Sequence, residues 1–342
     1  MSSAAIEVED LRKVFKLRER QPGMGALRQL FSPRTRDAVA VDRVSFRIAA
    51  GERVAFIGQN GAGKSTTIKM LAGVLFPSAG RASVAGHCPW REQKALSYCI
   101  GTVFGQRTQL WYHLPAADSF ELLKHVYDQR GDRYEKRRAE LIEAFAIGPH
   151  LHKPVRQLSL GERMRCEVVA SLLHTPDVLF LDEPTIGLDV SAKATIREVI
   201  RDESVRHGRT LLLTSHDTAD MERVCERAIV IHQGRILLDR SISALRQSYI
   251  RQKRVVLQTA EAELSLALPG VRVVSRAPHR LELEVDVSLT SIEQLIQTVL
   301  RRGHLHDLTI EDPPMDEIVH AIYQQASPRV LANESLPVGV PA

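Results

Sequence analysis

The stretch GQNGAGKST at residues 58–66 has the residue types and the spacing that bind a polyphosphate. Glycines allow positive φ, so successive backbone N–H groups can point toward phosphate oxygens. The lysine brings a positive charge to the β and γ phosphates, and the serine hydroxyl can ligate a Mg²⁺ that bridges them. The candidate binding residues are Gly58, Gln59, Asn60, Gly61, Ala62, Gly63, Lys64, Ser65 and Thr66. A plain glycine-rich turn is the alternative, but an apolar run precedes the stretch and a helical pattern follows it. We therefore predict that it binds ATP or GTP with Mg²⁺.

A pair of acidic residues ends a second apolar run, VLFLDEP at residues 178–184. Asp182 at the end of a strand can hold the Mg²⁺ shell, and Glu183 can polarise a water molecule that attacks the γ phosphate. Two acids after a strand can also simply cap a turn. Because the phosphate-binding pattern occurs in the same chain, we favour catalysis by Glu183 and metal binding by Asp182.

Strands and helices must position these residues, and the apolar pattern predicts where they lie. The runs at 54–57, 178–181 and 210–213 are largely apolar, as in strands buried on both faces, and each precedes a polar loop. Open α/β sheets bind ligands beyond the carboxyl ends of such strands. Alternation at residues 6–8 and 44–48 indicates half-buried antiparallel strands. Helical patterning follows the first buried strand, so we expect a helical subdomain at about 111–174.

The C-terminal part of the chain has a different pattern. We expect short strands at 254–258, 271–275, 281–285 and 308–310, and helices at 291–302 and 315–323. This gives a nucleotide-binding α/β domain at 1–248 and a small α+β accessory domain at 249–325. The proline-containing tail at 326–342 is expected to be disordered.

Composition restricts the class of protein. With 342 residues, 44% hydrophobic and 25% charged, the chain resembles ordinary globular proteins. No apolar run approaches the ~20 residues that span a bilayer, and the first residues lack the features of a signal peptide. Four widely separated cysteines favour reduced thiols. The net charge of +5 suits an anionic partner, but the basic residues are scattered and not interleaved with aromatic ones, so no nucleic acid is expected.

The order of further motifs resembles that of the ABC-type ATPases, the nucleotide-binding subunits of ABC transporters. After the phosphate loop come VFGQ with Gln106, LSLGE at residues 158–162, the DE pair, GLD with Asp189 and TSHD with His216. The resemblance extends over about residues 6–238 and uses several ordered motifs, so chance is a poor explanation. It implies an α/β P-loop NTPase with a helical subdomain, an antiparallel β subdomain and a small α+β C-terminal domain.

The resemblance also implies a head-to-tail homodimer with ATP at its interface. One copy would provide the phosphate loop and the other its signature helix, with Ser159 and the backbone of Gly161 as donors in trans. Glu162 and Asp189 are further candidates beside the nucleotide.

Three more residues gain a role only from this resemblance. Gln106 would join Ser65 and Asp182 as a Mg²⁺ ligand. His216 would contact the γ phosphate and hold the attacking water with Glu183, unless residues 215–217 merely start a helix. Phe15 lies where the family stacks an aromatic ring on adenine, or is an ordinary core residue.

Three positions depart from the family pattern. Leu160 and Glu162 stand where the signature usually has glycine and glutamine, and Glu162 brings negative charge toward a triphosphate. These changes bear on the strength of ATP-driven dimerisation. Gly105 makes the Gln loop one residue longer than expected, so Gln109 is the alternative to Gln106. The phosphate loop, strand-tip acids and switch histidine are all present, so we predict hydrolysis.

Two segments suggest contact with a membrane or a partner. Residues 16–37 are rich in arginine and could touch anionic lipid, although such runs more often form a solvated loop. Leu110, Trp111 and Tyr112 follow the Gln loop and could dock a membrane subunit, as in the family, or pack in the core.

We therefore predict an ATP-hydrolysing subunit that works as a homodimer with a separate integral membrane permease. It would be peripheral, on the cytoplasmic face of the inner or plasma membrane. The phosphate loop and the C-terminal PPMDEIVHAIY most resemble the exporter branch that handles drugs, polysaccharides or lipids.

Two other functions stay open. One is a soluble ABC-type clamp on nucleic acid or ribosomes, although the chain has a single phosphate loop and no coiled-coil heptads. The other is a regulatory module that binds ATP without hydrolysing it. The cargo is not predicted, because in the family the permease forms its pathway.

Overall fold

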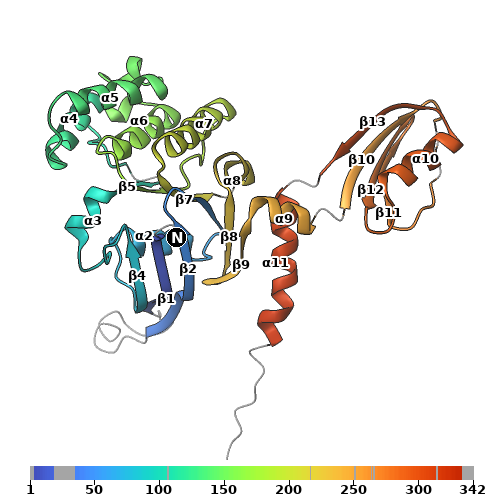
Figure 1. The fold of residues 1–342 in the computed structure, drawn as a ribbon, viewed down its shortest axis with the longest axis horizontal. Helices are drawn as coiled ribbons and strands as arrows, with labels where there is room; N and C mark the ends of the chain where they lie inside the picture. The colour runs from blue at the N-terminus through green and yellow to red at the C-terminus, as the bar shows by residue number, and fades with distance from the viewer. Residues whose placement is uncertain are drawn as a thin grey trace, which may run out of the picture. The chain divides into compact units, whose positions relative to one another are not determined.

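The computed structural model describes residues 4–18, 35–105, 108–215, 217–249, 252–262, 264, 266–312 and 315–332. Its contacts divide the chain into two compact units, Met1–Arg240 and Ser241–Ala342 (Figure 1). The first unit contains all the motifs that predicted nucleotide binding. The sequence placed the domain boundary somewhat later, at residue 248.

A six-stranded sheet forms the centre of the first unit, with the strand order β5-β6-β7-β3-β8-β9. The pairs β5–β6, β6–β7, β3–β7 and β3–β8 are parallel. All residues of β6 and β7 are buried, as their apolar runs predict for strands covered on both faces. The strands are β3 (Arg53–Ile57), β5 (Ile100–Phe104), β6 (Val178–Asp182), β7 (Thr210–Ser215), β8 (Arg227–His232) and β9 (Arg235–Ser241).

The register of this sheet brings the carboxyl ends of four strands into one row. Phe104 pairs with Asp182, and Asp182 pairs with Thr214 on the next strand. Ser215 in turn pairs with Ile57, the residue before the phosphate loop. The four loops that carry the predicted chemistry therefore begin side by side at one edge.

An antiparallel sheet with the order β2-β1-β4 completes the first unit. Val44, Phe46 and Ile48 are buried, whereas Ser45 and Arg47 between them are exposed, which is the alternation of a sheet covered on one face. Its buried side chains belong to one apolar core with those of β3 and α2. The strands are β1 (Ala4–Arg18), β2 (Thr35–Ala49) and β4 (Ala79–Val84).

The helices of the first unit include the expected helical region. Figure 1 places α4, α5 and α6 together at one end of the unit and the antiparallel sheet at the other. The helices are α2 (Lys64–Leu71), α3 (Gln93–Cys99), α4 (Ala116–Val126), α5 (Asp132–Ala144), α6 (Leu160–Leu172), α7 (Val190–His207) and α8 (Thr218–Val224). Two 3₁₀ turns, Gly148–His150 and Val155–Gln157, lie between α5 and α6.

The second unit contains a four-stranded antiparallel sheet with the order β11-β12-β10-β13. One sheet face and helix α10 form a small core that includes Val255, Leu283, Leu295 and Val299. The strands are β10 (Gln252–Thr259), β11 (Val271–Ala277), β12 (Arg280–Asp286) and β13 (Leu305–Glu311), and the helices are α9 (Ile242–Tyr249), α10 (Ile292–Arg302) and α11 (Met315–Ala332).

The C-terminal helix differs from its predicted length. It continues to Ala332, beyond the expected end at Tyr323, so the first residues of the expected tail are helical. Residues 333–342 lie outside the described residues. In the described part of the chain, no helix combines the length and the apolar character that a bilayer crossing requires.

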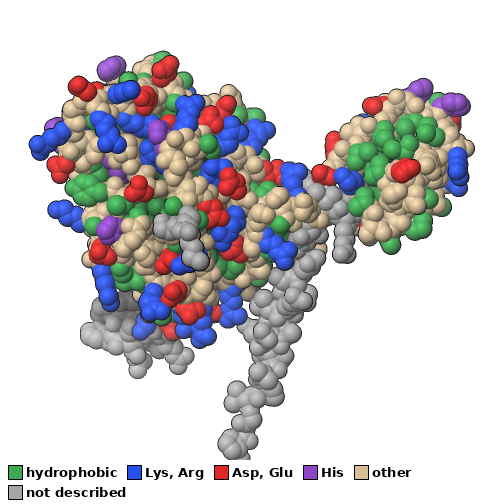
Figure 2. All heavy atoms as spheres, viewed as in Figure 1, with side chains coloured by type: hydrophobic (Ala, Val, Ile, Leu, Met, Phe, Trp, Pro, Cys, Tyr) green, Lys and Arg blue, Asp and Glu red, His purple; other side chains and the backbone are tan. Residues whose placement is uncertain are grey.

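Charge is mixed over the visible surface of the first unit. Figure 2 shows Lys and Arg side chains interspersed with Asp and Glu, so the net charge of +5 does not gather into one positive face in this view. The arginine-rich segment at 16–37 was predicted as a possible lipid contact. Most of it lies outside the described residues.

Candidate nucleotide-binding site

The phosphate loop runs from the end of β3 to the start of α2. Gly63 caps the helix with φ 108°, in the left-handed region. A Cβ atom on Gly63 would lie 2.5 Å from the carbonyl oxygen of Ala40, and one on Gly58 would lie 2.7 Å from that of Ile231. Both positions therefore require glycine. The backbone N–H groups of residues 63–66 have no acceptor among the described residues, so they are available to phosphate oxygens at a helix N-terminus.

Lys64 is folded back onto the loop. Its Nζ donates to the carbonyl oxygens of Gly58 at 2.5 Å and Gln59 at 3.2 Å, and its side chain is only 4% exposed. Burial lowers the pKa of Lys64, while the nearby charges of Glu183 and Asp182 oppose that shift. A buried ammonium group held on carbonyl oxygens has a strong preference for an anionic ligand.

Asp182 at the end of β6 connects the phosphate loop to β7. Its Oδ1 accepts from the Ser65 hydroxyl at 3.0 Å and from the Thr214 hydroxyl at 2.6 Å. The side chain is buried, so these two donors compensate for its loss of solvent. Asp182 and Ser65 thus present adjacent oxygens, as the sequence predicted for a Mg²⁺ site.

Glu183 has a strained backbone, with φ 56° in the left-handed region. Its N–H donates to Thr214, to the carbonyl oxygen at 3.0 Å and to the hydroxyl at 3.1 Å, which holds that conformation. Its Oε1 lies 3.9 Å from Nζ of Lys64. The turn thereby places the predicted general base beside the lysine that is predicted to bind the γ phosphate.

A cavity of about 270 Å³ lies at this point of the sheet edge. Ser65 and Lys69 of α2 line one side, Phe104 and Gly105 another, and Asp182, Glu183 and Ile186 a third. The cavity thus collects residues from the phosphate loop, the start of the Gln loop and the strand-tip acids. Those three motifs are far apart in the sequence.

The signature residues form the N-terminus of α6. Ser159 is the N-cap: its Oγ accepts from the N–H of Glu162 at 3.3 Å, and Glu162 Oε2 accepts from the N–H of Ser159 at 2.8 Å. This is a capping box, and Gln at the same position would form it equally well. The hydrogen bond from the Ser159 backbone lowers the pKa of Glu162, so its charge is present at neutral pH. Oε1 of Glu162 lies 3.4 Å from Nδ1 of His150.

The D-loop residue Asp189 is the N-cap of α7, where its carboxylate accepts from the N–H of Ala192 at 2.9 Å. Gly161 of the signature lies close to the same helix, since a Cβ on it would be 3.2 Å from that of Ala192. The signature and the D-loop are therefore adjacent in the fold. Neither lies in the cavity beside Lys64.

His216 and Gln106 lie outside the described residues. For His216 the structure describes both flanking residues. Ser215 donates to the buried Asp220, and the N–H of Asp217 donates to Ser215 Oγ at 2.9 Å. Arg197 of α7 donates to both Asp217 and Asp220. This network holds Ser215 and Asp217, the residues on either side of position 216, against α7 and α8.

The Gln loop is tied to the signature helix by Glu167, which sequence reasoning missed. This residue is 3% exposed, and it accepts from the Thr108 hydroxyl and from the N–H of Gln109. The Gln109 side chain donates to the carbonyl of Thr102 in β5, away from the acids. Gln109, the alternative to Gln106, therefore has its amide engaged elsewhere.

Thr214 was missed as well, although a threonine at the end of the apolar run LLLTS is a visible signal. A glutamate within the apolar stretch of α6 is a similar signal for Glu167. Both residues are buried and hydrogen-bonded to the predicted site.

Three aromatic residues, for which the sequence left open either a contact role or packing in the core, are exposed. Phe15 is 37% exposed beneath the ammonium of Lys13, whose Nζ lies 5.1 Å from the ring centroid. Trp111 and Tyr112 are 42% and 49% exposed. The alternative that Phe15 and Trp111 are core residues is therefore wrong.

Comparisons with known proteins find similar ATP-binding chains. A family model described as ABC transporter matches residues 41–186. The chain is 34% identical over 292 residues to a daunorubicin/doxorubicin resistance ATP-binding protein of Streptomyces peucetius, covering 83% of this chain and 87% of that protein. It is 30% identical over 218 residues to the ABC transporter ATP-binding protein NatA of Bacillus subtilis, covering 64% and 88%.

A solved structure of an ATP binding subunit of an ABC transporter superimposes with a TM-score of 0.60 at 26% identity, covering 72% of this chain and 93% of that one. The dimeric ATP-binding cassette MJ0796 bound to ADP and Pi has a similar fold, with a TM-score of 0.59 at 23% identity, covering 69% and 98%.

Proposed function

Because the chain belongs to the ABC transporter family of ATP-binding proteins, we propose that it hydrolyses ATP to drive a separate membrane permease. The observation that carries this proposal is the grouping of Lys64, Ser65, Asp182 and Glu183 around one sheet edge. A cation for the phosphates, two oxygens for a metal and a general base are the parts that phosphoryl transfer to water requires.

The fold predicted from the motifs is confirmed. The first unit is an ABC-type P-loop NTPase with a parallel sheet, a helical region and an antiparallel sheet, as in solved ATP-binding subunits. The predicted resemblance to the drug exporter branch is also confirmed, since two of the relatives are drug-resistance ATP-binding proteins.

Within the site, we assign binding of the β and γ phosphates to Lys64 and to the N–H groups of residues 63–66. Glu183 holds the attacking water and accepts its proton. His216, whose flanking residues are fixed by Asp220 and Arg197, would hold the γ phosphate. Thr214 positions both acids, because it donates to Asp182 and accepts from the N–H of Glu183.

Mg²⁺ fits the oxygens of Ser65 and Asp182. These atoms lie 3.0 Å apart, and neighbouring ligands of an octahedral Mg²⁺ are about 3 Å apart when each is at about 2.1 Å. Gln106 would be a further protein ligand of the ion. The bound ion would neutralise charge on the β and γ phosphates.

Two copies of the chain assemble around ATP. In each copy the N-terminus of α6 is free to face a partner's nucleotide, because Ser159 uses its oxygen as an acceptor and keeps its O–H as a donor. Glu162 and Asp189 lie next to it. Adenine stacking on Phe15 is consistent with the exposure of that ring.

The permease is a separate chain, and the complex exports its cargo. The relatives support this, since one is named a Nod factor export ATP-binding protein and others are drug-resistance ATP-binding proteins. The exposed Trp111 and Tyr112, beside the Gln loop, form the contact surface for the membrane subunit. The chain is then peripheral on the cytoplasmic face of the membrane.

The test is to isolate the Glu183→Gln chain with Mg·ATP from gently solubilised native membranes and to identify what copurifies. A stoichiometric multi-span protein would support the transporter function. Recovery only from the soluble fraction, alone or with nucleic acid or ribosomes, would contradict it.

A parallel ATPase assay separates a transporter ATPase from a regulatory module. The parent chain should hydrolyse ATP, and Glu183→Gln should bind ATP but lose 10²- to 10⁴-fold in rate, on the order expected for a general base. A parent chain without turnover would contradict the assignment of Glu183.

A further inference from the structure

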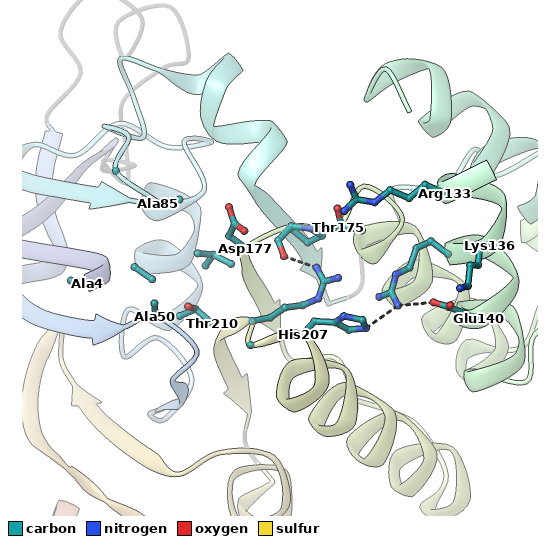
Figure 3. Close-up of a pocket in the computed structure, with 17 residues that line it drawn as sticks. Ala4, Ala50, Ala85, Arg133, Lys136, Glu140, Thr175, Asp177, His207 and Thr210 are labelled. Carbon is teal, nitrogen blue, oxygen red and sulfur yellow. Dashed lines mark hydrogen bonds and ion pairs between the residues drawn. The ribbon is translucent and has the colours of Figure 1, made fainter. Parts of the chain in front are cut away.

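A second and larger cavity lies at the opposite end of the central sheet (Figure 3). Its volume is about 790 Å³, and it is lined by Val178 and Thr210 at the amino ends of β6 and β7. Asp182 and Glu183, by contrast, lie at the carboxyl end of β6. This cavity, the amino-end cleft, is therefore separate from the nucleotide site.

The amino-end cleft is lined by cationic side chains from one helix and from the loop before a strand. Arg133, Lys136 and Arg137 come from α5, and Arg209 directly precedes β7. Figure 3 shows Arg133 and Lys136 reaching toward the cleft from α5, and His207 reaching toward it from the end of α7. Against four arginine or lysine residues, the lining contains only two carboxylates, Glu140 and Asp177.

Arg209 is the central residue of this cleft, because it is buried and has no direct ion pair among the described residues. It is 4% exposed, and the only hydrogen bond of its side chain among the described residues goes from Nη1 to the carbonyl oxygen of Pro176. No carboxylate lies within 4.0 Å of it among the described residues, and its buried Nε has no acceptor there. Buried guanidinium groups are normally paired with an anion.

The neighbouring Arg137, by contrast, is paired with carboxylates. It is 6% exposed, and its guanidinium group is paired with the buried Glu203 and, at 3.7 Å, with Glu140. Burial and the charge of Arg137 lower the pKa of Arg209 to about 10, although the charges of Glu203 and Asp177 oppose this shift, so it remains a cation at neutral pH. Among the described residues, Arg209 is thus a buried cation without a direct ion pair.

Arg133 and Lys136 add two exposed cations at the mouth of the cleft. Within the described residues neither is in an ion pair. Their long side chains can move toward a ligand, whereas Arg209 is held by the carbonyl of Pro176. One buried, fixed guanidinium and two exposed cations in the same cleft suit a ligand that has an oxyanion and further negative charge.

We propose that the amino-end cleft binds the phosphate or carboxylate group of a small anionic ligand, with Arg209, Arg133 and Lys136 as its cationic partners. A volume of about 790 Å³ is enough for a small organic anion and not only an inorganic ion. The ligand would bind while ATP occupies the phosphate loop, because the two sites are at opposite ends of β6.

The test uses the full chain with Glu183→Gln and saturating Mg·ATP, so that the phosphate loop is occupied. Bound nucleotide is quantified first, which separates a failure of ATP binding from a failure at the cleft. Inorganic phosphate and citrate are then titrated by calorimetry at constant ionic strength. We expect at least one of them to bind. Phosphate alone would indicate a phosphate ligand, and binding of both would indicate a general oxyanion site.

The deciding variant is Arg133→Gln with Lys136→Gln, because both residues are exposed, so their replacement should leave the fold intact. Anion affinity should fall about tenfold or more. The matched control, Lys94→Gln with Arg301→Gln, removes two exposed cations elsewhere and should change affinity less than twofold. No binding of either anion, or an equal loss in both double variants, would overturn the proposal.

Discussion

The N–H of Gln109 donates to the buried carboxylate of Glu167, with N to Oε2 at 3.0 Å. The same carboxylate accepts from the hydroxyl of Thr108. Glu167 lies in α6, the helix that begins with the signature residues, and Gln109 follows the Gln loop. One side chain thus connects the Gln loop, proposed to contact the metal in cis, to the signature helix, proposed to face the partner's nucleotide in trans.

We predict that Glu167→Gln loosens this connection. An amide has one oxygen acceptor and would direct its NH₂ toward existing donors, so the buried N–H of Gln109 loses a partner, at about 1–3 kcal/mol of unfolding free energy. Hydrogen exchange at residues 108–110 should become faster and ATPase activity should fall. Glu198→Gln, at an exposed position of α7, is the control. Unchanged exchange at Gln109 would contradict the connection.

Lys64→Met should separate ligand binding from folding. Methionine fills the space of the buried lysine stem but removes its charge and its hydrogen bonds to Gly58 and Gln59, so the free energy of unfolding without nucleotide should fall by no more than about 1–3 kcal/mol. ATP affinity should decrease about 10- to 100-fold. Equilibrium binding and urea unfolding measure the two quantities. Unchanged ATP affinity would show that Lys64 does not contact the phosphates.

Thr214→Val tests whether this threonine positions the acids. It removes the donor to Asp182 and an acceptor for the N–H of Glu183 while the side-chain volume is conserved. Thr210→Val is a matched control, since Thr210 at the other end of β7 accepts from the N–H of Gly51. Each variant should lose about 1–3 kcal/mol of stability. Only Thr214→Val should lower kcat substantially, and equal kcat values would contradict the positioning role.

His174 should make stability depend on pH. Burial lowers its pKa to about 4, whereas in the unfolded chain it titrates near the usual value of 6.5. Between those values the unfolded state binds more protons, so stability falls as the pH decreases, by about 2 kcal/mol at pH 5. His174→Gln keeps an amide donor for the carbonyl of Ile100 but cannot titrate.

Urea unfolding at pH 7 and pH 5 checks this expectation. The parent should lose more stability than His174→Gln over that interval. His125→Gln, which replaces a largely exposed histidine, should behave like the parent. An identical loss in the parent and His174→Gln would assign the pH dependence to other groups.

The sequence predicted the position of the strand-end residues better than the elements and side chains around them. Continuous apolar runs and motif spacing located Lys64, Asp182 and Glu183, because those residues are tied to strand ends whose burial is visible in the pattern. Strand β4 and helix α3 were not predicted, since three of the six β4 residues are exposed and α3 buries only Leu96, which leaves little apolar periodicity. Thr214 and Glu167 act through partners distant in the sequence, and spacing alone does not reveal such pairs.

Glu162 stands where the family signature usually has glutamine, and its effect on dimer assembly can be tested. Its carboxylate completes the capping box with Ser159, and its charge lies at the helix end that we propose faces the partner's triphosphate. Glu162→Gln keeps the box and removes the charge. In a Glu183→Gln background with Mg·ATP, we expect dimer affinity to rise about threefold to tenfold.

Glu162→Ala separates the charge from the cap, because it removes both and should cost about 1 kcal/mol of stability. Sedimentation velocity over a range of chain concentrations gives the dimer dissociation constant for each variant. If charge is the cause, the gain in the Glu162→Gln variant should shrink as salt increases, because screening weakens the repulsion in the parent. A dimer affinity that is the same with and without the Glu162→Gln substitution at low salt would mean that the carboxylate, held by Ser159 and beside His150, does not face the partner's phosphates.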